Sequence, residues 1–326
     1  MLHRCFVLGC VLPLNIANLG VTGAFPVNDP LYWQQAPYLE AVNVTGAWRR
    51  LHASGVVRKS VTVALIETGA QMDHPDLVAN LVEGYNVIDG SHNTDDIVGH
   101  GTAMAGILGA TINNKVGMAG VMDLVNIMPI SAVGLQTPQT LSAGIDYVIN
   151  NREAKGIQFI LFPFNYDVIE PYLADQFKRA DQAGILIIVT AGNLGKDITT
   201  EKRYPCALTE QFSSVLCVAA TEQSEMKLTY SANFADYVDV AAPGLRIMAT
   251  GLYNTYKPVP GSSASSAIVA GVVAMLYSLD PTLSPADIKK IIKETSKKGL
   301  TDHTGKVVFP FGLVDAEKAV AKLIQG

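Results

Sequence analysis

Short, almost continuously apolar runs alternate along this chain with longer segments in which apolar residues recur at helical spacing. An apolar run of only a few residues is too short for most helices and fits a strand that is buried on both faces. The pattern predicts such strands at residues 61–66, 124–130, 157–162 and 185–189. Between them it predicts helices at residues 140–151 and 172–183.

This alternation of strands and helices predicts a mostly parallel sheet with helices on both faces. Ser284, Pro285 and Asp287 have the pattern of a helix start, with a capping residue, a proline at the first helical position and an acid three residues after the cap. A last helix is expected over residues 314–323. The sequence contains no long linker, low-complexity tract or internal repeat. We therefore predict a single α/β domain.

The composition fits a protein with a large core. Of the 326 residues, 49% are hydrophobic and 16% are charged, against about 25% charged residues in an ordinary soluble domain. A disordered chain would show the opposite balance. The net charge of −5 argues against a nucleic-acid binder that works by neutralising phosphates. Beyond the N-terminus we find no apolar stretch of the roughly 18 residues that a membrane span needs, so no span is expected.

The N-terminus has the features of a secretory signal peptide at residues 1–24. A short basic start with Arg4 precedes an apolar run at residues 5–14, and small residues then offer a cleavage site near Ala24. The alternatives are an uncleaved anchor and an ordinary N-terminal strand. Cleavage would leave residues 25–326 as the mature chain, and we expect the protein to be secreted and extracellular.

Secretion changes how the cysteines are interpreted. Cleavage would remove Cys5 and Cys10 and leave Cys206 and Cys217 in the mature chain. An even number of cysteines in an oxidising compartment predicts a disulfide, here one that closes a short loop. Two buried free thiols are the alternative.

Polar residues follow two of the predicted strands. Glu67 comes directly after the run at 61–66, and Asn193 lies just beyond the run at 185–189. The carboxyl ends of parallel strands share one edge of the sheet, where α/β proteins bind their ligands. His100 stands between two glycines at the start of an apolar helical stretch, and Ser263 lies at the mouth of another. The free N–H groups there would stabilise an oxyanion.

These residues lie in motifs that resemble those of subtilisin-like serine proteases, in the order that the family shows. The matching segments are residues 66–69 with 74–77, 99–106, 117–121, 191–193, 238–244, 261–263 and 269–271. The resemblance covers essentially the whole mature chain. A lipase-type esterase is disfavoured because Ser265 replaces the last glycine of its serine motif. A dinucleotide-binding fold is disfavoured because Met104 replaces a glycine of its fingerprint.

The resemblance implies a role for each of four residues. Ser263 would be the nucleophile and His100 the general base. Glu67 would orient the imidazole, and Asn193 would stabilise the oxyanion together with the Ser263 N–H. The implied function is that of a secreted, monomeric serine endopeptidase that acts on polypeptides.

The acid departs from the family pattern, because Glu67 stands where the family has aspartate. A glutamate is longer by one methylene, about 1.5 Å, and a misplacement of about 1 Å can slow catalysis roughly a hundredfold. We therefore expect an enzyme of reduced activity. Asp73 is the nearest substitute acid.

The substrate groove also departs from the pattern. By resemblance, residues 158–163 align with a substrate-binding strand, and the predicted substrate contacts are Ile160, Leu161, Phe162 and Gly192. Phe162 and Pro163 replace glycines there and are expected to narrow the groove. We find no obvious pro-segment. These departures favour a second hypothesis, in which the chain is a catalytically impaired pseudoprotease that acts as a binding or decoy protein.

The resemblance implies a structural calcium ion as well. Side chains and backbone carbonyls would form an oxygen cage suited to a hard cation. Its predicted ligands are Gln34, Asp76, Ile112, Asn114, Val116 and Met118. The alternative is that Asp76 and Asn114 are ordinary turn residues.

Overall fold

The computed structural model describes residues 27–132 and 136–324, so the predicted signal peptide lies outside it. Within these residues, eight strands form one sheet in the order β10-β7-β6-β5-β4-β1-β3-β2, and every neighbouring pair is parallel. The strands are β1 Val61–Glu67, β2 Tyr85–Asn86, β3 Val125–Ser131, β4 Ile157–Phe162, β5 Leu186–Thr190, β6 Val215–Thr221, β7 Val240–Pro243 and β10 Gly312–Leu313. A separate antiparallel pair comprises β8 Ile247–Gly251 and β9 Thr255–Val259.

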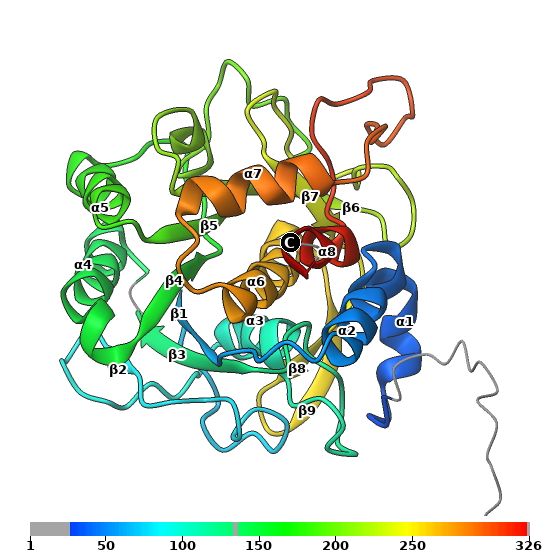
Figure 1. Ribbon diagram of the computed structural model, residues 1–326. Coiled ribbons are helices and arrows are strands. Elements are labelled where there is room, and N and C mark those ends of the chain that lie inside the picture. Colours follow the sequence, from blue (N-terminus) through cyan, green and yellow to red (C-terminus); the bar gives the residue numbers. More distant parts are fainter. Residues whose placement is uncertain (1–26, 133–135, 325–326) are drawn as a thin grey trace, which may run out of the picture.

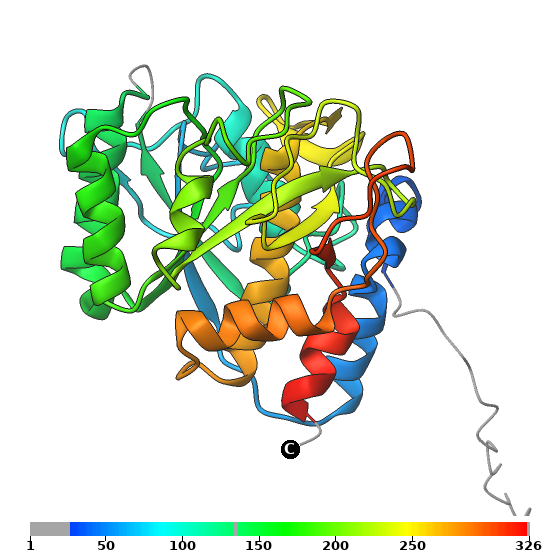
Figure 2. The ribbon, with the colours of Figure 1, turned by 90° about the horizontal axis from the view of Figure 1, so that it is seen from above.

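Helices cover both faces of the sheet (Figures 1 and 2). One layer contains α4 and α5, and the other is built around α6 with α2, α3, α7 and α8. The helices are α1 Tyr32–Ala41, α2 Val44–Ala53, α3 His100–Gly109, α4 Pro138–Lys155, α5 Pro171–Gln182, α6 Ser262–Leu279, α7 Pro285–Thr295, α8 Ala316–Ile324 and the short 3₁₀ helix η1 Cys206–Glu210.

The central strand β1 shows why the apolar runs are continuous. Its side chains point alternately to the two faces of the sheet. Val63 and Leu65 belong to the core on the α6 side, whereas Ala64 and Ile66 belong to the core on the α4 side. All four are fully buried. The predicted single α/β domain with a parallel sheet is therefore confirmed.

α6 runs through the middle of its helical layer (Figure 2). Its 18 residues have a mean hydropathy of 1.6, which by length and composition is enough to cross a membrane. The expectation that no stretch beyond the N-terminus reaches this length is therefore wrong, because α6 has no charged residue and its aliphatic residues outweigh its serines. However, 89% of the helix is buried inside the fold, so it is a core helix.

The sequence pattern locates β1, β3, β4 and β5 closely, but it misses the fully buried strands β6 and β7 as well as several peripheral elements. The start of α7 is confirmed, since the Ser284 hydroxyl accepts the Asp287 N–H and the Asp287 carboxylate accepts the Ser284 N–H. α1, α2 and the β8–β9 pair were not predicted. β9 is mostly exposed and contains Lys257 and Pro258, so it has no apolar run to mark it.

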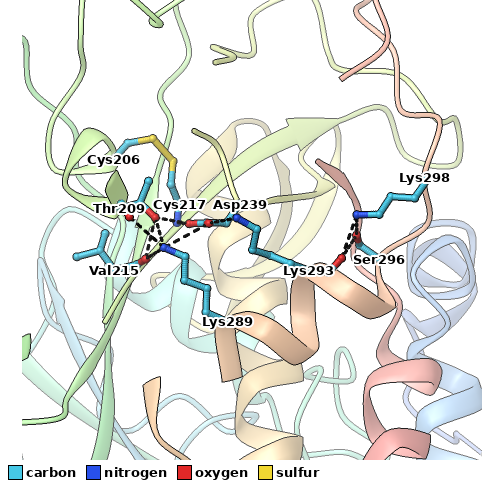
Figure 3. Close-up of polar contacts among 9 residues, drawn as sticks. All are labelled: Cys206, Thr209, Val215, Cys217, Asp239, Lys289, Lys293, Ser296 and Lys298. Carbon is cyan, nitrogen blue, oxygen red and sulfur yellow. Dashed lines mark hydrogen bonds and ion pairs between the residues drawn. A yellow bond between two sulfur atoms is a disulfide. The ribbon is translucent and has the colours of Figure 1, made fainter. Parts of the chain in front are cut away.

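The predicted disulfide between Cys206 and Cys217 is present and joins η1 to β6 (Figure 3). The nearby carboxylate of Asp239 is buried. It accepts the Cys217 N–H and forms ion pairs with Lys289 and Lys293 of α7. These contacts attach α7 to the sheet near the edge at which β7 begins, which is the edge opposite to the carboxyl ends of the strands.

Candidate active site

Three neighbouring strands of the sheet, β1, β4 and β5, bring polar groups to one edge. β1 ends at Glu67, Pro163 follows β4, and Asn193 lies just beyond β5. α3 begins with His100, and Ser263 is the second residue of α6. All five residues line one cavity of about 430 Å³. The structure thus brings the four predicted catalytic residues together.

Glu67 is fully buried, and its Oε1 lies 2.5 Å from Nδ1 of His100. Its Oε2 accepts the N–H of Thr68 at 2.8 Å. Gly101 allows α3 to begin this close to β1, because a Cβ at that position would lie 2.1 Å from the carbonyl oxygen of Gly69. With Nδ1 engaged by the carboxylate, Nε2 is the ring nitrogen left for a reacting group.

The environment of His100 favours its protonated form. Burial lowers the pKa of His100, but the hydrogen bond and charge of Glu67, helped by the charge of Asp96, outweigh it, so the pKa is raised above the ordinary histidine value. Asp73, the substitute acid, instead accepts a hydrogen bond from the Gln71 side chain. Glu67 is thus the carboxylate that supports the imidazole.

Ser263 presents its hydroxyl at the N-terminal end of α6. The hydroxyl donates to the carbonyl oxygen of Pro163 at 3.3 Å. Across residues 27–132 and 136–324, no hydrogen bond joins Ser263 to His100. Proton transfer between them therefore requires a contact that this state lacks, and catalytic hydrogen bonds often tighten only when substrate is bound.

The side chain of Asn193 is fixed by the first residue of α6. Its Oδ1 accepts the N–H of Ser262 at 2.8 Å and the Ser262 hydroxyl at 2.9 Å. Within the described part of the chain, its Nδ2 donates no hydrogen bond. The N–H of Ser263 lies in the first turn of α6, where N–H groups have no partner within the helix. Both donors can serve an oxyanion.

The structure does not bring three of the predicted substrate contacts to the cavity. Ile160, Leu161 and Phe162 are fully buried in β4 and pack into the two cores. Phe162 therefore cannot narrow the groove. The cavity is lined instead by the residues that follow them, Pro163, Phe164 and Asn165.

The fourth predicted contact, Gly192, is also buried, and its backbone contacts the first residue of α6. Its N–H donates to the Ser262 hydroxyl at 3.2 Å. Its φ is +101°, and a Cβ there would lie 2.1 Å from Nδ2 of Asn165. A glycine is therefore needed for Asn165 to reach its position at the cavity.

The loop predicted to bind calcium is closed by its own hydrogen bonds. The Asp76 carboxylate accepts the side-chain amide of Asn114 at 2.8 Å and the N–H of Met118 at 2.9 Å. The Asn114 oxygen accepts the N–H of Val116 at 2.7 Å. Gln35, rather than the predicted Gln34, bonds to the chain next to the loop, through Ala119. In this arrangement the oxygens of Asp76 and Asn114 accept N–H groups of their own loop, and the described residues contain no group of three or more His, Cys, Asp or Glu side chains that could hold a metal ion, so the structure does not show the predicted calcium site.

Comparison with known proteins identifies the class. A model of the subtilase family matches residues 58–313. The chain is 30% identical to thermitase of Thermoactinomyces vulgaris over 296 residues, which cover 90% of this chain and 98% of thermitase. It is 28% identical to subtilisin Savinase of Lederbergia lenta over 272 residues, covering 82% and 93% of the two chains. A solved protease structure from Pseudoalteromonas arctica has the same fold, with a TM-score of 0.78 at 23% identity and coverage of 91% and 99%.

The chain therefore belongs to the subtilase family. Subtilases are serine-type endopeptidases, and this membership assigns the chain to that enzyme class. The resemblance inferred from the motifs is confirmed.

Sequence reasoning missed five polar residues of the cavity, Asn165 and Arg203 together with Thr68, Gln136 and Thr190. Asn165 follows an apolar run whose end in the sheet cannot be read from composition. Arg203 lies in a segment without a regular pattern, and the sequence offers no signal beyond a cation directly before Tyr204 and Pro205.

Proposed function

We propose that this protein is a secreted endopeptidase in which Ser263, His100 and Glu67 form the catalytic triad. The observation that carries the proposal is the 2.5 Å contact between the buried Glu67 and His100, at a cavity that Ser263 also lines. This contact fixes the imidazole as a general base needs. Glutamate then performs the role that aspartate has in the family pattern.

In the proposed reaction, Ser263 Oγ attacks the carbonyl carbon of the peptide bond while Nε2 of His100 takes the hydroxyl proton. The C–O bond forms, and the carbonyl electron pair moves to the oxygen. The C–N bond then breaks, and His100 gives its proton to the leaving amine. Water, activated by the same imidazole, hydrolyses the acyl-enzyme and restores the serine.

The surrounding groups stabilise the charges that this reaction creates. Glu67 lies against the imidazolium that forms when His100 is protonated. Nδ2 of Asn193 and the N–H of Ser263 would donate to the oxyanion, and one such donor contributes about 3–4 kcal/mol to transition-state stabilisation in subtilisin. The positive end of the α6 dipole acts in the same direction.

Hydrolysis of an unfolded protein such as reduced casein tests this proposal. We expect fragments with the wild-type enzyme and none with S263A. S265A is the matched control, because Ser265 lies in the same helical turn and donates to the carbonyl of Pro243, away from the reacting groups. Equal hydrolysis by S263A and the wild type would refute the triad.

The hydrogen bond from Ser263 to Pro163 favours a second candidate, a pseudoprotease that binds polypeptides without cleaving them. In this state the hydroxyl donates to a backbone carbonyl rather than to His100. A folded wild-type protein that binds a polypeptide but leaves it intact for many hours would support this candidate over the first.

Secretion is part of the proposal. The disulfide between Cys206 and Cys217 supports it, since such bonds persist in oxidising compartments. N-terminal sequencing of protein recovered from the culture medium is expected to begin at residue 25. Size-exclusion chromatography is expected to show a monomer.

A further inference from the structure

A largely buried cation lines the same cavity as Ser263. The side chain of Arg203 is only 13% exposed. The neighbouring Tyr204 forms two backbone hydrogen bonds with Tyr166, at 2.6 and 2.8 Å. Tyr166 directly follows Asn165, so this bridge holds Arg203 next to the cavity wall that continues β4.

The hydrogen-bonding capacity of this guanidinium is only partly used. Its Nη2 donates to Oδ1 of Asn165 at 2.7 Å, and its Nη1 forms an ion pair with Asp167. Its Nε is buried and has no hydrogen-bond partner within the described residues. A largely buried charge is costly, and a carboxylate can offset this cost by accepting two parallel hydrogen bonds from a guanidinium.

The existing counter-ion can be displaced by a ligand. The side chain of Asp167 is 84% exposed, and this residue is not among those that line the cavity. Ion pairs at so exposed a carboxylate contribute little stability. The carboxylate inside the cavity, Glu67, is already engaged by His100. Arg203 is therefore available to an anionic group that enters the cavity.

We propose that this cavity receives an acidic side chain, glutamate or aspartate, from the substrate residue that precedes the cleaved bond, and that Arg203 binds its carboxylate. The inference rests on the proposed endopeptidase function. We place the acidic residue before the cleaved bond because Pro163–Asn165 form one wall of the cavity. This wall continues β4, the strand that by resemblance contacts the substrate residue before the cleaved bond. Arg203 is thus a specificity-determining residue.

Matched quenched-fluorescence peptides that differ only in this residue test the proposal. For the wild type we expect kcat/KM to be about ten- to hundredfold higher with glutamate than with glutamine, as for a charge-assisted hydrogen-bonded pair. R203Q is expected to abolish this ratio. K202Q is the control, because Lys202 carries the same charge one position away, lies outside the cavity lining and pairs with Glu210. A wild-type ratio near one would overturn the proposal.

A second variant keeps the test valid if R203Q does not fold. D167N removes the exposed competitor of a substrate carboxylate, and its exposure makes the substitution harmless to folding. We expect D167N to raise the ratio of glutamate to glutamine hydrolysis severalfold. An unchanged or reduced ratio would contradict the role of Arg203.

Peptide binding separates this inference from the proposed function. With S263A, which cannot form an acyl-enzyme, the dissociation constants of the same peptides are measured by fluorescence anisotropy. Tighter binding of the glutamate peptide supports the inference even if the wild type cleaves nothing, which would refute the endopeptidase alone. Equal binding of the two peptides, beside normal cleavage by the wild type, would refute the inference alone.

Discussion

Shortening the triad acid with E67D tests whether the site is built around glutamate. In the structure, Glu67 Oε1 already lies 2.5 Å from His100 Nδ1, so the extra methylene of glutamate is accommodated. Removing it withdraws the carboxylate by about 1.5 Å, which would increase the separation from 2.5 Å to about 4 Å. No hydrogen bond forms at that distance.

We therefore expect E67D to lower kcat/KM by roughly a hundredfold, the cost of a misplacement of about 1 Å. Loss of the carboxylate altogether sets an upper limit of about ten-thousandfold. Initial rates on a quenched-fluorescence peptide measure the effect, with thermal unfolding as a check on folding. D73N is the control, because Asp73 bonds to Gln71 rather than to the imidazole. A rate for E67D equal to or above that of the wild type would show that glutamate is merely too long and would refute this reasoning.

Four further predictions concern the active site and the Asp76 loop. Because the pKa of His100 is raised, kcat/KM should increase with pH through a midpoint above the ordinary histidine pKa of about 6.5. E67Q should move this midpoint to lower pH. An unchanged midpoint in E67Q would contradict Glu67 as the cause of the raised pKa. Protonated His100 also stabilises the fold, a contribution fully present below the ordinary pKa and lost as pH rises through the raised one, so the wild type should lose more stability than H100A over that interval in urea titrations. N193A should reduce kcat about 100- to 1,000-fold with little change in KM, the range known for removal of one oxyanion donor from subtilisin, whereas a change confined to KM would argue against this role. Because Asp76 is hydrogen-bonded within its own loop, a chelator should leave the melting temperature unchanged, and a fall of several degrees that calcium reverses would show that the loop rearranges to bind the ion.

Some buried parts of the fold could be predicted from the sequence, although the equally buried strands β6 and β7 were missed. β1 and β4 are fully or almost fully buried, so their apolar runs mark them within one residue. The start of α7 could be predicted because its cap is formed by neighbouring residues. The exposed β9 could not, since its position depends on pairing with β8 rather than on an apolar pattern of its own.

The roles of the candidate catalytic residues rest on the family resemblance, but their gathering at one edge could be predicted for a topological reason. Glu67 and Asn193 follow parallel strands and must reach the same edge of the sheet, where the starts of α3 and α6 meet them. The substrate wall could not be placed, because residues 157–164 are almost uniformly apolar and do not show where the chain leaves the sheet. Arg203 reaches the cavity through the bridge between Tyr166 and Tyr204, a long-range pairing without a local signal.

Covalent labelling by a fluorophosphonate tests the triad most directly, because the reagent modifies a serine only when a neighbouring base activates it. Intact-mass measurement is expected to show one label on the wild-type protein, a much slower reaction with H100A and no label on S263A. A folded wild-type protein that stays unlabelled, or one labelled equally in S263A, would contradict the assignment of Ser263, His100 and Glu67 as a working catalytic unit.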